Sequence, residues 1–176
     1  ALIVADQYST DNYQIWGQFW QVPYYPAKTN VLSPAQSLEH KIPVVVMQWA
    51  ARDPVGGFGK GVEESTLSVQ PNDYMDYHNL GIDYFSKLVD IYTTQKLSSF
   101  NQLVVGLENS YSWQKYEQEY QNQVQLLSEK KARGQFSFAT MSTFANWYQA
   151  SFPGLSPEHV IVADDPLGSS KKVVWF

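Results

Sequence analysis

The chain has 176 residues, of which 44% are hydrophobic and 16% charged, and its net charge is −5. This length suits one globular domain, and the composition excludes a disordered or highly charged chain. The acidic balance argues against nucleic acid as a partner. The absence of cysteine excludes disulfides and thiolate metal sites. No apolar run approaches the ~20 residues of a membrane-spanning helix, so we expect no membrane insertion.

The first half of the chain predicts two strands and one helix. The opening "LIVA", residues 2–5, reads as a short strand. A long aromatic region follows, in which the prolines between residues 23 and 34 prevent a continuous helix. The apolar run 44–49 predicts a strand buried on both faces. Apolar residues at helical spacing then predict a helix within 82–96.

The second half continues the alternation of strands and helices. Gly134 is placed to end one helix, and Ser142 or Thr143 to cap the next. In chain order we expect a strand at 102–107, a helix at 112–133, a strand at 135–141, a helix at 142–152, and strands at 159–166 and 171–176.

Strands that alternate with helices imply parallel pairing through right-handed crossovers. We therefore expect an α/β fold with a mainly parallel sheet and alternating helices. A complete (β/α)₈ ring typically takes ~250 residues, so a partial or distorted (β/α) barrel or an open sheet is expected for one domain spanning 1–176. From the start at Ala1 and the strand-like end at Trp175-Phe176 we expect a truncated fold, a fragment of a longer chain.

Polar residues follow every predicted strand of this sheet. In parallel α/β folds, ligands bind at the carboxyl ends of the strands, which lie at one edge. The aromatic content of 15% also suits a ligand-facing surface, because Tyr and Trp combine an apolar body with a polar edge. The candidate binding residues are Trp49, Arg52, Asp53, Asn109, Tyr111, Trp113 and Thr140, and the candidate catalytic residues are Glu108, Asp164 and Asp165.

Glu108 is the most informative of these residues, because glutamate is a poor turn residue and follows an aliphatic strand. Asp53 and Asp165 suit the turns before Pro54 and Pro166 as well as they suit a site. Two carboxylates on facing strand ends are the minimum for glycoside hydrolysis. Glu108 with Asp164 or Asp165 is the expected pair. Arg52 would keep a carboxylate charged, and the rings of Trp49, Tyr111 and Trp113 would stack on sugar faces.

Other motifs do not support a cofactor or a metal. "DPVGGFGKG" is rich in glycine, but Gly61 stands where a phosphate-binding loop needs Ser or Thr. "NDYMDYH" groups Asp73, Asp76 and His78, yet the three histidines form no metal-binding spacing. Asp73 is better read as a helix cap. We expect neither a metal nor a cofactor.

The order of "LVVGLENSYSW", "FSFATMSTFANWY" and "VIVADDPLG" resembles the catalytic half of the distorted (β/α)₇ barrels of polysaccharide deacetylases and glycoside hydrolase family 57. The likeness covers residues 100–168. It implies Glu108 as nucleophile and Asp164 or Asp165 as acid. The deacetylase metal motif and the early histidine motif of family 57 are missing.

Two functional classes stay open at this point. In the first, the chain is part of a carbohydrate-active enzyme that hydrolyses a glycan with paired carboxylates. In the second, it is a noncatalytic domain that binds a glycan or another partner on a related scaffold. The expected partner of both is a glycan or other polyhydroxylated small molecule.

Overall fold

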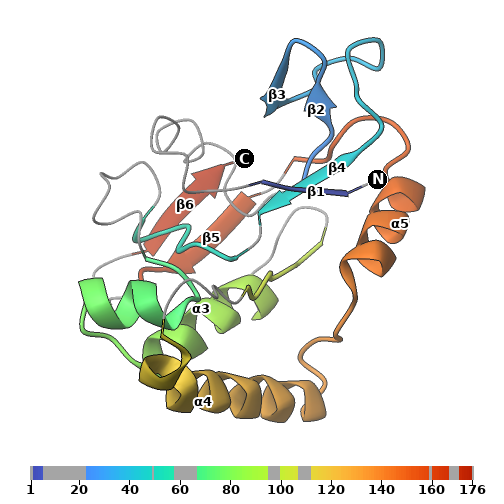
Figure 1. The fold of residues 1–176 in the computed structure, drawn as a ribbon. Coiled ribbons are helices and arrows are strands. Elements are labelled where there is room, and N and C mark those ends of the chain that lie inside the picture. Colours follow the sequence, from blue (N-terminus) through green and yellow to red (C-terminus); the bar gives the residue numbers. More distant parts are fainter. Residues whose placement is uncertain are drawn as a thin grey trace.

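A computed structural model describes residues 2–5, 23–48, 50–57, 67–94, 100–106, 112–158, 160–166 and 171–175. Within these ranges four short strands come first, followed by the helices and then by two more strands (Figure 1). The elements are β1 (Leu2–Ala5), β2 (Pro26–Ala27), β3 (Asn30–Pro34), β4 (Val45–Gln48), the π-helix η2 (Asn72–Tyr77), α3 (Ile82–Thr94), α4 (Trp113–Ala132), α5 (Met141–Ser151), β5 (Val160–Asp164) and β6 (Lys171–Trp175).

The described strands form three separate pairs. Strands β1 and β4 run parallel, with Leu2 opposite Val45. Strands β2 and β3 form an antiparallel hairpin, and β5 and β6 form another, with Val160 opposite Trp175 (Figure 1). The expectation of a mainly parallel sheet in a partial (β/α) barrel is therefore wrong. Parallel pairing was inferred from the expected alternation of strands and helices, whereas only residues 165–170 separate β5 from β6, too few for the crossover that parallel strands need.

Two of the predicted strands are irregular backbone. Residues 101–106 and 136–140 have no regular secondary structure. The Val104 carbonyl accepts a hydrogen bond of 2.7 Å from the Ala51 N–H, which joins the first stretch to the segment after β4. A strand requires a ladder of such bonds to a neighbour. The apolar alternation of these stretches predicted a ladder that is not formed.

The three predicted helices are confirmed as α3, α4 and α5. Helix α4 ends where the sequence indicated, because Gly134 adopts a φ of 75° that suits glycine. The Gly134 and Gln135 N–H groups donate to the carbonyls of Lys131 and Lys130, which closes the helix end. At the start of α5 the cap is Thr140, whose side chain accepts from the Thr143 N–H, rather than Ser142 or Thr143.

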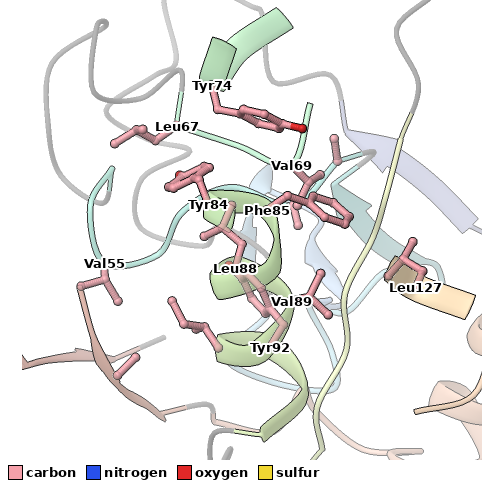
Figure 2. Close-up of a cluster of buried hydrophobic side chains, with 14 residues drawn as sticks. Val55, Leu67, Val69, Tyr74, Tyr84, Phe85, Leu88, Val89, Tyr92 and Leu127 are labelled. Carbon is pink, nitrogen blue, oxygen red and sulfur yellow. The ribbon is translucent and has the colours of Figure 1, made fainter. Parts of the chain in front are cut away.

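The larger hydrophobic core forms around α3 (Figure 2). Phe85, Leu88 and Val89 on this helix are fully buried, and Leu127 of α4 joins the same cluster. The spacing of the three α3 residues is that of one helix face, which is why the sequence located this helix correctly. The core holds α3 and α4 at the base of the segments that carry the predicted site.

A second core lies under α5. Tyr148 of α5 packs edge-on against Tyr25, with ring centroids 5.3 Å apart. Its hydroxyl donates to the Pro23 carbonyl at 2.8 Å. Val45 and Met47 of β4 complete this cluster, so α5 is fixed against the β1–β4 pair (Figure 1). In the part of the chain that the structure describes, no helix is long and apolar enough to cross a membrane.

Candidate functional site

An ion pair between Arg52 and Asp73 forms the buried centre of the region after β4. Arg52 Nη1 lies 3.3 Å from Asp73 Oδ2, and both side chains are 2% exposed. The Ser68 hydroxyl donates to the same carboxylate oxygen at 2.6 Å, and Asn72 Nδ2 donates to Oδ1 at 2.9 Å. Asp73 lies inside η2, whose N-cap is Pro71, so the expected cap role of Asp73 is wrong. The structure places the guanidinium of Arg52 in this pair.

Asp53, the next residue, closes a tight turn. Its Oδ1 accepts hydrogen bonds from the backbone N–H groups of Val55 at 2.8 Å and Gly56 at 2.7 Å. Its Oδ2 accepts from the Tyr84 hydroxyl at 3.0 Å. A Cβ atom on Gly56 would lie 2.6 Å from Asp53 Oδ2, so the turn requires glycine there. Asp53 thus fills the turn role that the sequence allowed as an alternative.

Asp165 lies close enough to influence this carboxylate. Burial raises the pKa of Asp53 above its usual value, and the charge of Asp165 raises it further. The hydrogen bonds from Gly56, Val55 and Tyr84 oppose the shift but do not cancel it. Asp165 is itself buried, whereas Asp164 is exposed at the end of β5. The charge of Asp165 thus acts on Asp53, whose carboxylate also accepts from Tyr84 of α3.

This burial predicts how the stability of the protein changes with pH. The folded protein binds the Asp53 proton more tightly than the unfolded chain, whose Asp pKa is about 3.9. The charged carboxylate therefore lowers the free energy of unfolding as the pH rises from about 4 through the raised pKa. Asp53→Asn keeps the acceptor for both N–H groups and removes this charge. In urea unfolding from pH 3 to 7.5, we expect the variant to gain stability relative to the parent above about pH 4.

Asp76 provides a control of opposite sign. Desolvation opposes the shift, but hydrogen bonds from Lys115 and Tyr116 lower the pKa of Asp76 below its usual value. Its stabilising contribution is therefore present above about pH 4 and is lost as the pH falls further. The difference between Asp76→Asn and the parent should change mainly below that pH. A pH-independent difference for Asp53→Asn would contradict the raised pKa.

Four predicted site residues lie outside the residues that the structure describes. They are Trp49, Glu108, Asn109 and Tyr111. The distance between Glu108 and either Asp164 or Asp165, on which the hydrolase hypothesis depends, is therefore untested.

Trp113 begins helix α4 and is 52% exposed. Its ring stacks on Tyr120, one face against the other, with centroids 5.2 Å apart and planes 6° from parallel. Leu127 of α4 lines a cavity between residues 102–105 and 136–141. It lies roughly 20 Å from Trp113 along the helix axis. Trp113 is not among the residues that line that cavity.

A cavity of about 350 Å³ lies between residues 102–105 and 136–141. We call it the aromatic cavity, because the rings of Phe136, Phe138 and Phe144 form part of its wall. Aliphatic side chains from β4, from 103–105 and from α4 form much of the remainder. Its volume lies within the range of ligand pockets, roughly 300–1,000 Å³. The two irregular stretches that the sequence predicted as strands thus form opposite walls of a cavity.

Among the described residues that line the aromatic cavity, the polar groups are uncharged. They belong to Thr93, Gln102, Ser137 and Thr140. Of the predicted site residues that the structure describes, Thr140 lines the cavity, and it also caps α5 through the Thr143 N–H at 3.1 Å. The hydroxyl of Thr93 donates to the Val89 carbonyl at 2.7 Å and keeps lone pairs that can accept.

Most of this lining was not predicted from the sequence. Phe136 and Phe138 were placed in a predicted strand at 135–141, and Phe144 in a predicted helix at 142–152. The available signal was the aromatic spacing of "FSF" followed by Phe144, because rings two residues apart project to the same side of an extended segment. Sequence alone does not distinguish a ring facing a cavity from a ring facing the core.

Among the residues that the structure describes, no group of three acidic or histidine side chains could hold a metal ion. Asp73, Asp76 and His78 do not converge, because Asp73 binds Arg52 while Asp76 binds Lys115 and Tyr116. The described lining of the aromatic cavity offers hydroxyl and amide groups, which suit hydrogen bonding to a neutral ligand.

Comparison with protein families gives one match. Residues 2–156 match a family described as a domain of unknown function with solved-structure structure (DUF3863). No curated protein and no solved structure matches the chain. The resemblance to polysaccharide deacetylases and glycoside hydrolase family 57 is wrong, because a different family matches and the described strands form no parallel barrel. The matched residues make up most of the chain and include α3, α4, α5 and the described lining of the aromatic cavity, and the chain therefore belongs to the DUF3863 family.

Proposed function

We propose that this chain binds a neutral glycan in the aromatic cavity and does not hydrolyse it there. The observation that supports this function is the wall chemistry, which combines three phenylalanine rings with hydroxyl and amide groups and has no charged side chain among the described lining residues. Ligand pockets typically combine apolar walls with a few polar groups that fix orientation.

The rings favour the apolar faces of a sugar, and the polar groups favour its hydroxyls. The hydroxyls of Thr93 and Thr140 already bond within the fold, to the Val89 carbonyl and from the Thr143 N–H, and their remaining lone pairs can accept from the hydroxyls of a sugar. The described lining residues offer no opposite charge to a charged ligand. A polyhydroxylated neutral ligand matches these acceptors and needs no opposite charge.

The arrangement of carboxylates favours binding over hydrolysis. Glycoside hydrolysis uses two carboxylates on either side of the scissile bond. The described lining of the aromatic cavity has none. Asp53 and Asp165 are both buried, and Asp53 accepts hydrogen bonds from its own turn and from Tyr84.

Phe138 offers the sharpest test, because it lines the cavity and is 58% exposed, so its removal disturbs the core little. We expect Phe138→Ala to weaken binding about tenfold, since the variant loses ring stacking and buried apolar area. Phe138→Tyr keeps the ring and should retain most of the affinity. Binding would be measured on an array of neutral mono-, di- and hexasaccharides of glucose, galactose, mannose and xylose, followed by titration calorimetry on the strongest binder.

The controls separate this site from the two alternatives. Trp113→Ala removes a half-exposed ring outside the cavity and should leave binding unchanged. A loss with Trp113→Ala but not with Phe138→Ala would move the site to the start of α4. Release of reducing ends by the parent protein, abolished by Glu108→Gln, would replace the binding function by hydrolysis. Absence of any binding on the array would contradict both functions.

A further inference from the structure

Trp147 extends the wall of the aromatic cavity along α5. Met141 and Phe144 line the cavity, and Trp147 follows Phe144 by three residues on the same helix. Residues three apart on a helix are neighbours on its surface. The ring centroids of Phe144 and Trp147 are 5.5 Å apart. Met141 and Trp147 are each 43% exposed, so the row runs from the cavity onto the surface.

Three aromatic rings hold the indole of Trp147 in one orientation. Phe100 packs against it at 5.0 Å with planes 78° apart, and Phe152 at 5.9 Å with planes 90° apart. Phe144 is the third neighbour. The near-perpendicular contacts with Phe100 and Phe152 bring the edge of one ring against the face of another, which is a favoured aromatic geometry. A half-exposed ring that is already fixed loses little conformational entropy when a ligand covers it.

Burial of Trp147 by the fold itself would have been the ordinary outcome for such a large apolar side chain. Tyr148, the next residue, is fully buried and hydrogen-bonded to the Pro23 carbonyl. Helix α5 is therefore anchored through Tyr148. Phe138, another residue that lines the cavity, is also exposed.

We propose that Trp147 is a stacking platform for a second sugar unit, so that the ligand is an oligosaccharide whose end enters the aromatic cavity and whose next unit lies along α5. This proposal rests on the glycan-binding function above. Its occupant is one continuous chain, because the ring of Phe144, which lines the cavity, has its centroid 5.5 Å from that of Trp147.

The test compares ligands of different length on the same glycan array and by calorimetry. Trp147→Ala should weaken binding of hexasaccharides about tenfold, because one stacked unit is lost. Binding of the matching monosaccharide, which fills only the cavity, should change by less than about twofold. Trp147→Tyr keeps a ring and should restore most of the hexasaccharide affinity. Melting temperatures of both variants would verify that α5 remains folded.

Trp113→Ala is the matched control, because this tryptophan is also half exposed and helical but lies away from the cavity. It should change neither hexasaccharide nor monosaccharide binding. If Phe138→Ala weakens binding and Trp147→Ala does not, the platform proposal fails while the cavity function stands. Equal losses for both ligand lengths would also overturn it. So would a dimer of the parent protein that Trp147→Ala dissociates, because the surface would then bind a second copy of the chain.

Discussion

Replacing Asp73 by alanine is expected to lower the free energy of unfolding by about 3–5 kcal/mol. The guanidinium of Arg52 would remain buried without its opposite charge. Ser68 and Asn72 would also lose their acceptor inside the fold. Unsatisfied buried groups pay the desolvation cost without the compensating bond. Urea unfolding at pH 7, followed by circular dichroism, measures this loss directly.

Asp76→Ala is the matched control for this substitution. Asp76 lies on the same helix, and its ion pair with Lys115 is partly open to water, with side chains 32% and 56% exposed. Exposed ion pairs contribute about 0–1 kcal/mol because water screens them. Asp76→Ala should therefore cost about 1 kcal/mol or less. Equal losses for Asp73→Ala and Asp76→Ala would show that burial does not distinguish the two pairs.

Truncating Phe85 to alanine is expected to cost a similar amount, about 3–5 kcal/mol, for a different reason. Phe85 is fully buried in the middle of the core around α3 (Figure 2). The substitution removes the transfer free energy of the ring and leaves a void that the surrounding side chains fill only in part. Thermal and urea unfolding should both report the loss without a change in helix content at low temperature.

The control for Phe85 is Val124→Ala on α4. Val124 is exposed on the outer face of the helix, so its truncation removes no core contact. Its effect should stay within about 0.5 kcal/mol. A loss of less than 1 kcal/mol for Phe85→Ala would mean that α3 is not the centre of the core. Both outcomes are measurable in the same series of unfolding curves.

The helices were predictable from sequence because their hydrogen bonds are local. The apolar spacing of Phe85, Leu88 and Val89 describes one helix face, and Gly134 marks a helix end that only glycine adopts easily. The buried strand β4 was also located, as a continuous apolar run within one residue of its observed start. In the helices, the two partners of each backbone hydrogen bond lie within four residues of each other. In β4, burial is visible in the sequence as an uninterrupted apolar run.

Strand pairing was not predictable in the same way. Residues 101–106 and 136–140 have the apolar content of strands, but a strand exists only when a distant segment supplies its ladder. These stretches enclose the aromatic cavity instead. The parallel expectation failed because alternation along the chain does not state which strands are neighbours in space.

The predicted site residues were likewise only partly placed correctly from the sequence. They were predicted because they follow strands, and the charge of Asp165 does act on the buried Asp53. Arg52, however, is buried against Asp73, a residue that the sequence assigned to a helix cap. Two half-exposed tryptophans also differ only by their surroundings, since Trp113 stacks on Tyr120 and Trp147 adjoins the cavity wall.

Local patterns in the sequence were enough to locate α3, α4, α5 and the buried strand β4. The pairing of the strands, the burial of Arg52 with Asp73 and the rings that line the cavity depend on contacts between segments far apart in the chain. Helical hydrogen bonds close within four residues, whereas sheet ladders, buried ion pairs and cavity walls join segments tens of residues apart.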